Sequence, residues 1–436
     1  MKIHFIGIGG IGISGLAKYM RFSGHDVSGS DMRATHITQR LIDRGIDVRI
    51  GHSPSNIPDG CDLVVHSAII KDSNVEVIEA KARGIEVLHR REALIQILQE
   101  KQVYAVAGAH GKSTTTSILS SIMSGSAIIG AESKGFGSNV RYDGSTSVML
   151  FEADESDGSF LNSNPYCSIV VNAEPEHMEY YNYDTDAFYS AYRKFIELAQ
   201  LRVLNAEDPF LSTLDIEAIR LYPSRDITNI EYILIDDEPY TRFSLDGFGE
   251  FEVWGFGEHI ALDASLAIMA AAQSMSVASI RANLLHFKGN KKRFDVVFKG
   301  REFIIIDDYA HHPTEIKATM SSIRVYENLK KLPSVSVIWQ PHKYSRTIDN
   351  LDAFVECFDG CDELIILPVW AASEEYREID FVGKFSRYNL ILADDINRDG
   401  DSIDIIKDGS VIKTIERDLI VGFSAGDLTY KLRGSK

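Results

Sequence analysis

Short apolar segments alternate with helix-like segments along almost the whole of this 436-residue chain. The apolar run KIHFIGI at residues 2–8 is followed by glycines and then by the helix-like segment IGISGLAKYMRF. The same order recurs up to residue 100, with strand-like runs at 26–31, 47–50, 62–68 and 85–90. Such alternation predicts an α/β fold, in which parallel strands are connected by helices that cover the sheet.

A second α/β unit begins at Val103, and a basic run near Gly289 predicts a further domain junction. Between them we expect strands at 103–108, 147–154 and 167–174, a long helix at 186–200, and an antiparallel meander at 230–254. After the junction, a hairpin at 294–308 opens a third alternating region. We interpret the stretch DINRDGDSID at 395–404 as an acidic, solvated loop.

Charge and composition exclude several classes of protein. The formal net charge of −18, from 45 basic and 63 acidic residues, argues against non-specific nucleic-acid binding, which needs a basic surface. No apolar run is long enough to span a membrane, and the N-terminus lacks the pattern of a signal peptide. Four cysteines without a C-x-x-C pair are typical of a reducing compartment. We therefore expect a cytoplasmic protein that does not bind membranes or nucleic acid.

The first glycine-rich loop, GIGGIG, has a G-x-G-x-x-G pattern between a strand and a helix. Glycine permits a tight turn and close backbone approach, and the helix N-terminus attracts a pyrophosphate. Asp31 ends the second strand, where a carboxylate can bond a ribose hydroxyl. Alone, the pattern is compatible with a nicotinamide enzyme, with another diphosphate nucleotide, or with a purely structural turn.

A second loop, VAGAHGKSTTT, ends like a Walker phosphate loop, but Val106 stands where that pattern begins with glycine. Backbone N–H groups in such a loop can cradle phosphates, Lys112 can reach the β and γ oxygens, and Ser113 can ligate Mg²⁺. The segment therefore predicts a nucleoside triphosphate site. The alternative is a helix N-terminus with no ligand.

Charged and polar side chains also follow several of the other expected strands. Carboxylates in FEADESD, Glu152 among them, are candidate Mg²⁺ ligands, although a solvated acidic turn would show the same composition. His177 in NAEPEHM could be a ligand, a base or a capping residue. DDYAHHPTE and QPHKYSRT each follow a strand of the third region, and ligands of open α/β sheets bind beyond the carboxyl ends of strands.

Together these stretches resemble the Mur ligases, the ATP-dependent amino-acid ligases of peptidoglycan precursor synthesis. That family shows GIGGxGMSGLA, GTHGKTTT, EADESD, NxEPDHM, DDYxHHPTE and QPHRYTRT. Here the same order reads GIGGIGISGLA, GAHGKSTTT, EADESD, NAEPEHM, DDYAHHPTE and QPHKYSRT. The short GTHGKTTT form accounts for the missing glycine at position 106. The matches span almost the whole chain and are most similar to the members that join L-alanine to UDP-N-acetylmuramate.

The resemblance implies three domains and a two-step reaction. The domains would be an N-terminal Rossmann-like parallel sheet for UDP-N-acetylmuramate (1–101), a central P-loop ATPase-like α/β domain for ATP (102–288), and a C-terminal Rossmann-like domain for L-alanine (289–436). The lactyl carboxylate would attack the γ-phosphate of ATP, and the amine of L-alanine would then displace phosphate from the acyl phosphate. The implied cofactors are ATP and Mg²⁺, and we expect a monomer or a homodimer.

Carried over position by position, the resemblance also implies the site residues. The catalytic set would be Lys112, Glu152, His177 and Arg293, with Ser113, Glu152 and His177 around the metal. The ATP-binding set would be Gly108, His110, Gly111, Lys112, Ser113, Thr114, His259, Asp263 and Asp308. UDP-N-acetylmuramate would contact Gly7, Gly9, Gly10, Ile11, Gly12, Ser30, Asp31 and Ser67. L-Alanine would contact His311, Lys343 and Arg346.

The departures from the family pattern include four that bear on the binding of ATP and L-alanine. The adenine stretch GxHNxxNALAA is GEHIALDASLA here, so Ile260 and Asp263 replace two asparagines, and Asp263 can still accept from an exocyclic amine. Lys292 and Lys343 replace arginines and lack the bidentate guanidinium.

Three other functions fit part of the sequence. They are a recycling ligase that joins a murein peptide to the same sugar nucleotide, a nicotinamide-dependent dehydrogenase, and a nucleotide-sensing module without turnover. The Lys112 loop and the EADESD cluster favour a ligase, because hydride transfer requires neither.

Overall fold

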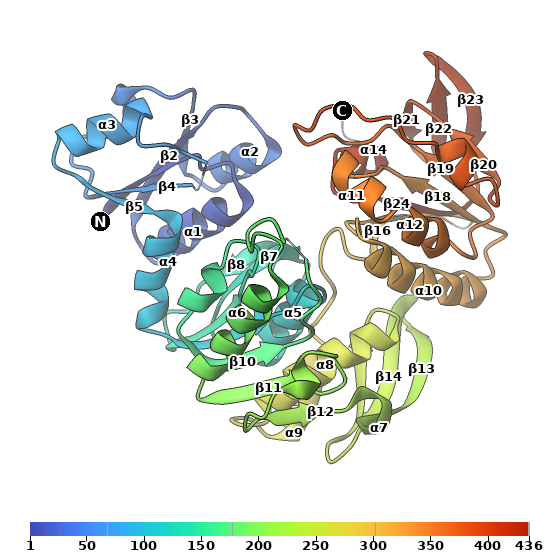
Figure 1. Ribbon diagram of the computed structural model, residues 1–436, viewed down its shortest axis with the longest axis horizontal. Helices are drawn as coiled ribbons and strands as arrows, with labels where there is room; N and C mark the ends of the chain where they lie inside the picture. The colour runs from blue at the N-terminus through green and yellow to red at the C-terminus, as the bar shows by residue number, and fades with distance from the viewer. Residues whose placement is uncertain (68, 177, 301, 435–436) are drawn as a thin grey trace. The chain divides into compact units, whose positions relative to one another are not determined.

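The computed structural model describes residues 1–67, 69–176, 178–300 and 302–434, and Figure 1 labels their helices and strands. The chain forms two compact units. The first comprises Met1–Ile227 with Leu262–Phe287, and the second comprises Thr228–Ala261 with Lys288–Lys436. Within the described residues, no helix is both long and apolar enough to cross a membrane.

The first unit opens with a five-stranded parallel sheet in the order β3-β2-β1-β4-β5. Its strands are β1 (Lys2–Ile6), β2 (Asp26–Asp31), β3 (Asp47–Ile50), β4 (Leu63–His66) and β5 (Glu86–His89), and its helices are α1 (Ile11–Phe22), α2 (His36–Asp43), η1 (Pro54–Asn56), α3 (Val75–Ala82) and α4 (Arg90–Gln99). The chain winds from β1 outward to β3 and then returns to place β4 on the other side of β1. Ligands of α/β sheets bind at such a reversal of strand order.

Alternating side chains on β1 explain how the helices cover this sheet. Ile3 and Phe5 pack with α1, α2 and α4, whereas Ile6 on the opposite face packs with α3. His4 is also fully buried and bonds to Glu76 of α3, so a polar cluster interrupts the apolar packing on that face.

A seven-stranded sheet completes the first unit, in the order β12-β11-β10-β6-β9-β7-β8. Its strands are β6 (Gln102–Ala107), β7 (Ser126–Ser133), β8 (Ser138–Arg141), β9 (Val148–Glu152), β10 (Pro165–Val170), β11 (Leu201–Asn205) and β12 (Ile219–Leu221). The associated helices are α5 (Lys112–Ile122), η2 (Ser159–Asn162), α6 (Thr185–Leu198), η3 (Leu211–Thr213), α7 (Pro223–Asp226), α8 (Glu258–Ala271) and α9 (Val277–Leu284). The strands pair in parallel except β8, which is antiparallel to β7. Because β6 lies between β9 and β10, the loops that follow these three strands meet at one edge.

The second unit combines a three-stranded sheet with a six-stranded sheet in the order β16-β17-β24-β18-β19-β20. The first comprises β13 (Ile227–Ile235), β14 (Glu238–Leu245) and β15 (Gly249–Trp254). The second comprises β16 (Asp295–Lys299), β17 (Phe303–Asp308), β18 (Val335–Trp339), β19 (Glu363–Ile366), β20 (Leu390–Leu392) and β24 (Asp418–Phe423). The helices are α10 (Pro313–Lys330), α11 (Tyr344–Asp349), α12 (Leu351–Cys357), α13 (Phe381–Lys384) and α14 (Leu428–Leu432). Helices α10 and α12 cover one face of the larger sheet, and α14 covers part of the other.

The prediction of an acidic, solvated loop at residues 395–404 is wrong. This segment forms β21 (Asp395–Asp399) and the start of β22 (Ser402–Lys407), which continues into β23 (Ser410–Ile415) as an antiparallel sheet. Alternate isoleucines, Ile396, Ile403 and Ile405, are buried against the larger sheet, while the acidic side chains face outward. The turn at Gly400, with a φ of +59°, is a glycine-initiated hairpin turn, a signal that the acidic composition obscured.

The predicted α/β class is confirmed, with a parallel sheet at the N-terminus and mainly parallel sheets in the central and C-terminal regions. The domain boundaries at residues 101 and 288 stay a prediction.

Candidate active site

The loop between β6 and α5 requires glycine at two positions. Gly108 has a φ of +150° and Gly111, the N-cap of α5, has a φ of +82°, both in the region that disfavours side chains. A Cβ at Gly108 would lie 3.2 Å from the Asn172 backbone, and one at Gly111 would lie 2.6 Å from Asp263 Oδ1. The loop therefore presents its backbone at the N-terminus of α5, where phosphates can be bound.

Lys112 is held at the start of α5 by three oxygen atoms. Its Nζ donates to the carbonyl oxygens of Gly108 (2.6 Å) and Ala109 (3.3 Å) and to Glu155 Oε1 (2.9 Å). Burial alone would lower the pKa of Lys112, but Glu155 and the neighbouring carboxylates outweigh burial and raise this pKa. The ammonium group is therefore positively charged at neutral pH and lies inside the phosphate loop.

Ser113 and Glu152 face each other from neighbouring elements. The Ser113 hydroxyl donates to Glu152 Oε1 at 3.0 Å, and the Gly130 N–H donates to Glu152 Oε2 at 2.6 Å. Burial raises the pKa of Glu152, against the opposing effects of these donors and of Lys112. The structure thus brings the predicted serine and carboxylate together at the carboxyl end of β9.

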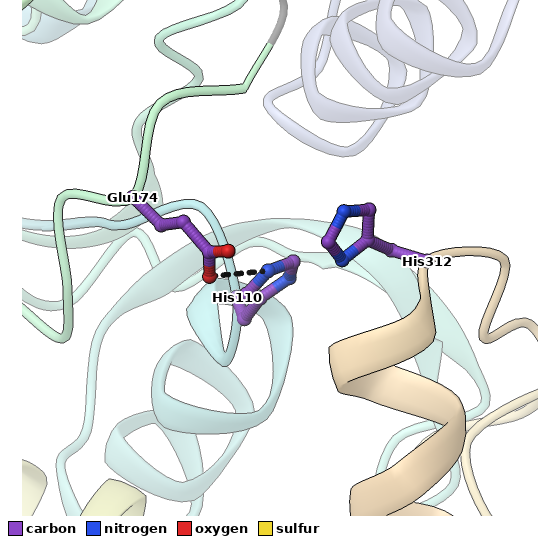
Figure 2. A group of neighbouring side chains, drawn as sticks. All are labelled: His110, Glu174 and His312. Carbon is purple, nitrogen blue, oxygen red and sulfur yellow. Dashed lines mark ion pairs between the residues drawn. The ribbon is translucent and has the colours of Figure 1, made fainter. Parts of the chain in front are cut away.

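His110 is anchored by residues that follow β10. The Asn172 side chain accepts from the His110 N–H and donates to the His110 carbonyl, both at 3.0 Å. Glu174 Oε2 lies 3.2 Å from His110 Nε2 (Figure 2). The third side chain drawn in that figure, His312, belongs to the second unit. Asn172 therefore connects the phosphate loop to the adjacent strand.

The first glycine loop is held by backbone and carboxylate acceptors at the end of β2. The N–H groups of Gly7 and Ile8 donate to the Ser30 carbonyl (2.8 and 2.9 Å), and the Gly9 N–H donates to Asp31 Oδ2 (2.9 Å). Ser67, which follows β4, has a buried hydroxyl without a hydrogen-bond partner among the described residues. A Cβ at Gly7 would lie 2.6 Å from that hydroxyl, so the Ser67 side chain lies directly against the loop.

Beneath this loop, Glu76 is fully buried and accepts five hydrogen bonds. Its donors are His4 Nε2, the Ser30 hydroxyl, His52 Nδ1, the Ser53 N–H and Asn56 Nδ2. Burial opposes ionisation of Glu76, but these donors outweigh burial and lower its pKa to about 2. Ser30 therefore supports the loop through its carbonyl and contacts Glu76 through its hydroxyl.

We expect Glu76→Gln to lower stability by about 1–3 kcal/mol near neutral pH, because an amide group would face donors that now meet a carboxylate. The pKa of Glu76 is about 2 in the folded chain and 4.5 by itself. Its ionisation therefore stabilises the fold above pH 4.5, and this contribution is lost as the pH falls toward 2. Urea midpoints of both proteins at pH 7 and pH 3 measure the difference. An equal gap at both values would contradict the assignment.

In the second unit, Arg293 and His311 share a carboxylate. Glu315, in the first turn of α10, lies 3.4 Å from Arg293 Nη1 through Oε1 and accepts the His311 N–H at 3.1 Å through Oε2. The Arg293 guanidinium also lies 5.5 Å from the centre of the Tyr309 ring. Asp308 accepts from the Phe294 and Ala310 N–H groups, both at 2.8 Å, and burial raises its pKa to about 6.

The loops after β18 and β19 place His342 between two predicted alanine-site residues. Its Nδ1 lies 3.0 Å from Arg346 Nη1, and its ring centre lies 5.9 Å from that of His311. Burial lowers the pKa of His342 to about 4, and His311 and Arg346 act in the same direction. Lys343 has a φ of +68° and donates its N–H to the Trp370 carbonyl at 2.9 Å.

Comparison with known proteins places the chain in a family. A model described as Mur ligase family, catalytic domain, matches residues 2–102, and one described as Mur ligase, glutamate ligase domain, matches residues 292–399. The UDP-N-acetylmuramate–L-alanine ligase of Campylobacter curvus (strain 525.92) is 54% identical over 433 residues, which cover 99% of each chain. The enzyme of that name from Helicobacter pylori (strain P12) is 51% identical over 436 residues, 99% of this chain and 96% of the relative. The chain belongs to the Mur ligase family.

Solved Mur ligase structures share its fold. The UDP-N-acetylmuramate–alanine ligase of Thermotoga maritima superposes with a TM-score of 0.81 at 24% identity, over 99% of this chain and 97% of that one. A murein peptide ligase from Psychrobacter arcticus 273-4 superposes with a TM-score of 0.64 at 23% identity, over 98% and 96%. The three-domain architecture expected from the sequence is thus the architecture of this family.

Most of the site residues predicted from the sequence lie at the carboxyl edges of the sheets of this Mur ligase. A few lie elsewhere in the fold, and His177 and the side chain of Ile11 are not among the described parts of the chain. Asp263 is buried against Gly111, Thr114 is half-buried in the first turn of α5, and His259 is exposed in the first turn of α8. Gly10 is the N-cap of α1, and Gly12 packs against Arg90.

The sequence did not predict the contacts of four residues that hold the site together, although Glu155 was among the candidate Mg²⁺ carboxylates and His342 among the polar residues that follow a strand. They are Asn172, Glu155, Glu315 and His342, each of which bonds a predicted site residue. All four lie inside the motifs that carried the resemblance, and that position was the available signal.

Proposed function

We propose that this protein joins L-alanine to the lactyl carboxylate of UDP-N-acetylmuramate and converts ATP to ADP and phosphate. The observation that carries the proposal is 48–54% identity, over 99% of this chain, to relatives named for that reaction. A loop that holds Lys112 and Ser113 beside two carboxylates supports a phosphoryl-transfer step. The first unit therefore supplies the groups that activate a carboxylate.

In the first step, a lactyl oxygen attacks the γ-phosphorus, and the bond to the β-bridging oxygen breaks to release ADP. The loop N–H groups and Lys112 stabilise the phosphate charge, because fixed donors in a site that excludes water favour developing negative charge. In the second step, the amine of L-alanine attacks the acyl carbon and phosphate leaves. Arg293 acts on the transferred phosphate in this proposal, and His311, Lys343 and Arg346 act on the alanine carboxylate.

Ser113 and Glu152 fit a magnesium ion. A hydroxyl and a carboxylate oxygen 3.0 Å apart are hard oxygen donors, the kind that Mg²⁺ prefers. When bound, Mg²⁺ would offset the negative charge of the ATP phosphates. We assign these two residues to that ion, with His177 as a third candidate from the family resemblance.

The first glycine loop is proposed to bind the diphosphate of UDP-N-acetylmuramate. The loop leads into the N-terminus of α1, whose N-cap, Gly10, makes no side-chain cap hydrogen bond, and helix N-termini bind phosphates. The Ser67 hydroxyl is a buried donor without a protein partner among the described residues. Asp31 is already engaged with the Gly9 N–H through Oδ2, so its role combines loop support with the ribose contact. Both nucleotides are cytoplasmic metabolites, and we place the enzyme in the cytoplasm.

A panel of acceptors tests this function. ADP release is measured with ATP, Mg²⁺ and UDP-N-acetylmuramate, and with L-alanine, glycine, L-serine or the tripeptide L-alanyl-γ-D-glutamyl-meso-diaminopimelate. We expect L-alanine to give a kcat/KM at least about tenfold above glycine and L-serine, a difference that one methyl or hydroxyl group can produce. Turnover with the tripeptide but not with L-alanine would indicate the recycling ligase. NADH binding without ADP release would indicate a dehydrogenase.

A further inference from the structure

The segment that carries Arg293 is held in a strained backbone conformation. Lys292 and Phe294, its two neighbours, have φ values of +60° and +44°. Non-glycine residues keep such conformations only where the surrounding structure determines them, and they concentrate at functional sites. Two of them on either side of one arginine indicate that the direction of that arginine is controlled.

Hydrogen bonds of residues 292–294 help to hold this segment, and the Arg293 N–H itself donates to the Asn290 carbonyl at 3.4 Å. The Lys292 N–H donates to Asp295 Oδ2 at 3.1 Å, and the Lys292 carbonyl accepts the Tyr309 N–H at 2.7 Å. On the other side of Arg293, the Phe294 N–H donates to Asp308 Oδ2 at 2.8 Å. Asp295 is 4% exposed, and a carboxylate buried to this extent is stable only beside a compensating positive charge.

The compensating group comes from the far end of the chain. Arg433 Nη2 lies 2.5 Å from Asp295 Oδ2 and 2.7 Å from Asp307 Oδ2, and Asp307 is 1% exposed. The Thr429 hydroxyl donates to the same Asp307 oxygen at 2.5 Å. One guanidinium thus lies between two buried carboxylates that would otherwise repel each other.

We propose that Arg433 is a positioning residue for Arg293, acting through Asp295 and the strained segment 292–294. It touches neither substrate nor nucleotide in this scheme. It pairs with the Asp295 carboxyl group and holds it in place, and Asp295 keeps Lys292 in the conformation that directs Arg293. This inference rests on the proposed function, which assigns Arg293 to the transferred phosphate. The proposal makes a C-terminal residue necessary for phosphoryl transfer.

The test compares Arg433→Ala with a matched control, Arg398→Ala. Arg398 donates to the Leu432 carbonyl at 2.8 Å, so it also anchors the C-terminal helix, but the structure gives it no bond to Asp295 or Asp307. We expect Arg433→Ala to lower kcat for ADP release by about tenfold or more, with the KM for UDP-N-acetylmuramate within about twofold of wild type. Arg433→Lys, which keeps one charge, should recover part of the loss. Arg398→Ala should keep kcat near wild type.

A double-mutant cycle separates positioning from general damage. If Arg433 acts through Arg293, Arg293→Ala/Arg433→Ala should be no slower than Arg293→Ala alone. Multiplied losses in the double variant, equal kcat losses in Arg398→Ala and Arg433→Ala, or a wild-type kcat in Arg433→Ala would each overturn the proposal.

Amide hydrogen exchange gives a readout that does not need turnover. Peptides covering residues 292–294 should exchange faster in Arg433→Ala than in wild type, and at the wild-type rate in Arg398→Ala. Unchanged exchange in Arg433→Ala would overturn the proposed positioning role of Arg433, even if the variant enzyme were inactive. A wild-type protein without ADP release would instead count against the proposed function alone.

Discussion

Lys112→Ala is expected to abolish ADP release in the presence of ATP, UDP-N-acetylmuramate and L-alanine. Lys112 is the positively charged side chain fixed inside the phosphate loop, 2.6 Å from the Gly108 carbonyl. Removing a cation that stabilises a transferring phosphoryl group should lower kcat/KM by about 10³-fold or more, roughly 4 kcal/mol of transition-state stabilisation. A coupled assay for ADP measures the loss, and turnover within tenfold of wild type would contradict the proposed site.

Lys112→Ala also leaves the buried Glu155 carboxylate without its positively charged partner. A double variant separates the resulting loss of stability from the loss of activity. Glu155 is fully buried and its Oε1 lies 2.9 Å from Lys112 Nζ. Breaking such a pair on one side can cost about 3–5 kcal/mol, whereas removing both charges is far less destabilising. Lys112→Ala/Glu155→Gln should therefore unfold at a temperature closer to wild type than Lys112→Ala, yet remain inactive. Recovery of activity together with stability would show that Lys112 is structural.

Glu152→Ala is expected to have a comparable effect on turnover. Glu152 is the carboxylate that meets Ser113 at 3.0 Å and receives the Gly130 N–H at 2.6 Å. Without it, the proposed Mg²⁺ would keep the serine hydroxyl but lose its anionic ligand, and the ATP phosphates would be less well neutralised. We expect kcat to fall by about 10³-fold, in line with other losses of charge stabilisation.

A magnesium titration distinguishes a lost ligand from a lost fold. Glu152→Gln keeps the size of the side chain and one oxygen, so it should retain slight activity that rises with Mg²⁺ at concentrations where wild type is saturated. Binding of UDP-N-acetylmuramate, measured by calorimetry, should stay within about threefold of wild type, because the first glycine loop belongs to a different sheet. Wild-type turnover in Glu152→Ala, or loss of sugar-nucleotide binding, would contradict the assignment.

Much of the fold was predictable because its local patterns were strong. The strand from Lys2, the helix Ile11–Phe22 and the loop–helix boundary at Lys112 all lie where apolar periodicity and glycine placed them. Weak strands escaped: β7, β8, β11 and β12 were not assigned, and the three strands from Asp395 to Ile415 were taken in part for a loop. Strands β8 and β12 are short edge strands, and β21 to β23 form a small sheet in which charged residues obscure the alternation of apolar ones. Strands β7 and β11 lie inside the seven-stranded sheet and were missed although both carry apolar residues.

The candidate site likewise has residues that the sequence identifies and contacts that only the fold reveals. Motif residues such as Lys112, Ser113 and Glu152 could be named from sequence, because the chemistry of phosphate and metal binding restricts residue type at short spacing. Which residues they contact could not be predicted, even where the partner lies in a motif, as Glu155 does. Lys112 meets Glu155 across 43 residues, His110 meets Asn172 across 62, and Arg433 meets Asp295 across 138. No spacing rule covers such distances.

By itself, then, the sequence determined the alternation of strands and helices, the two glycine loops and the order of the family motifs, since these depend on residues near one another in the chain. Only the tertiary structure decided which side chains support them. Parallel pairing of β6 with β9 and β10 brings three distant loops to one sheet edge. Burial at that edge then requires each charge to find a partner, because an unpaired buried charge is unstable.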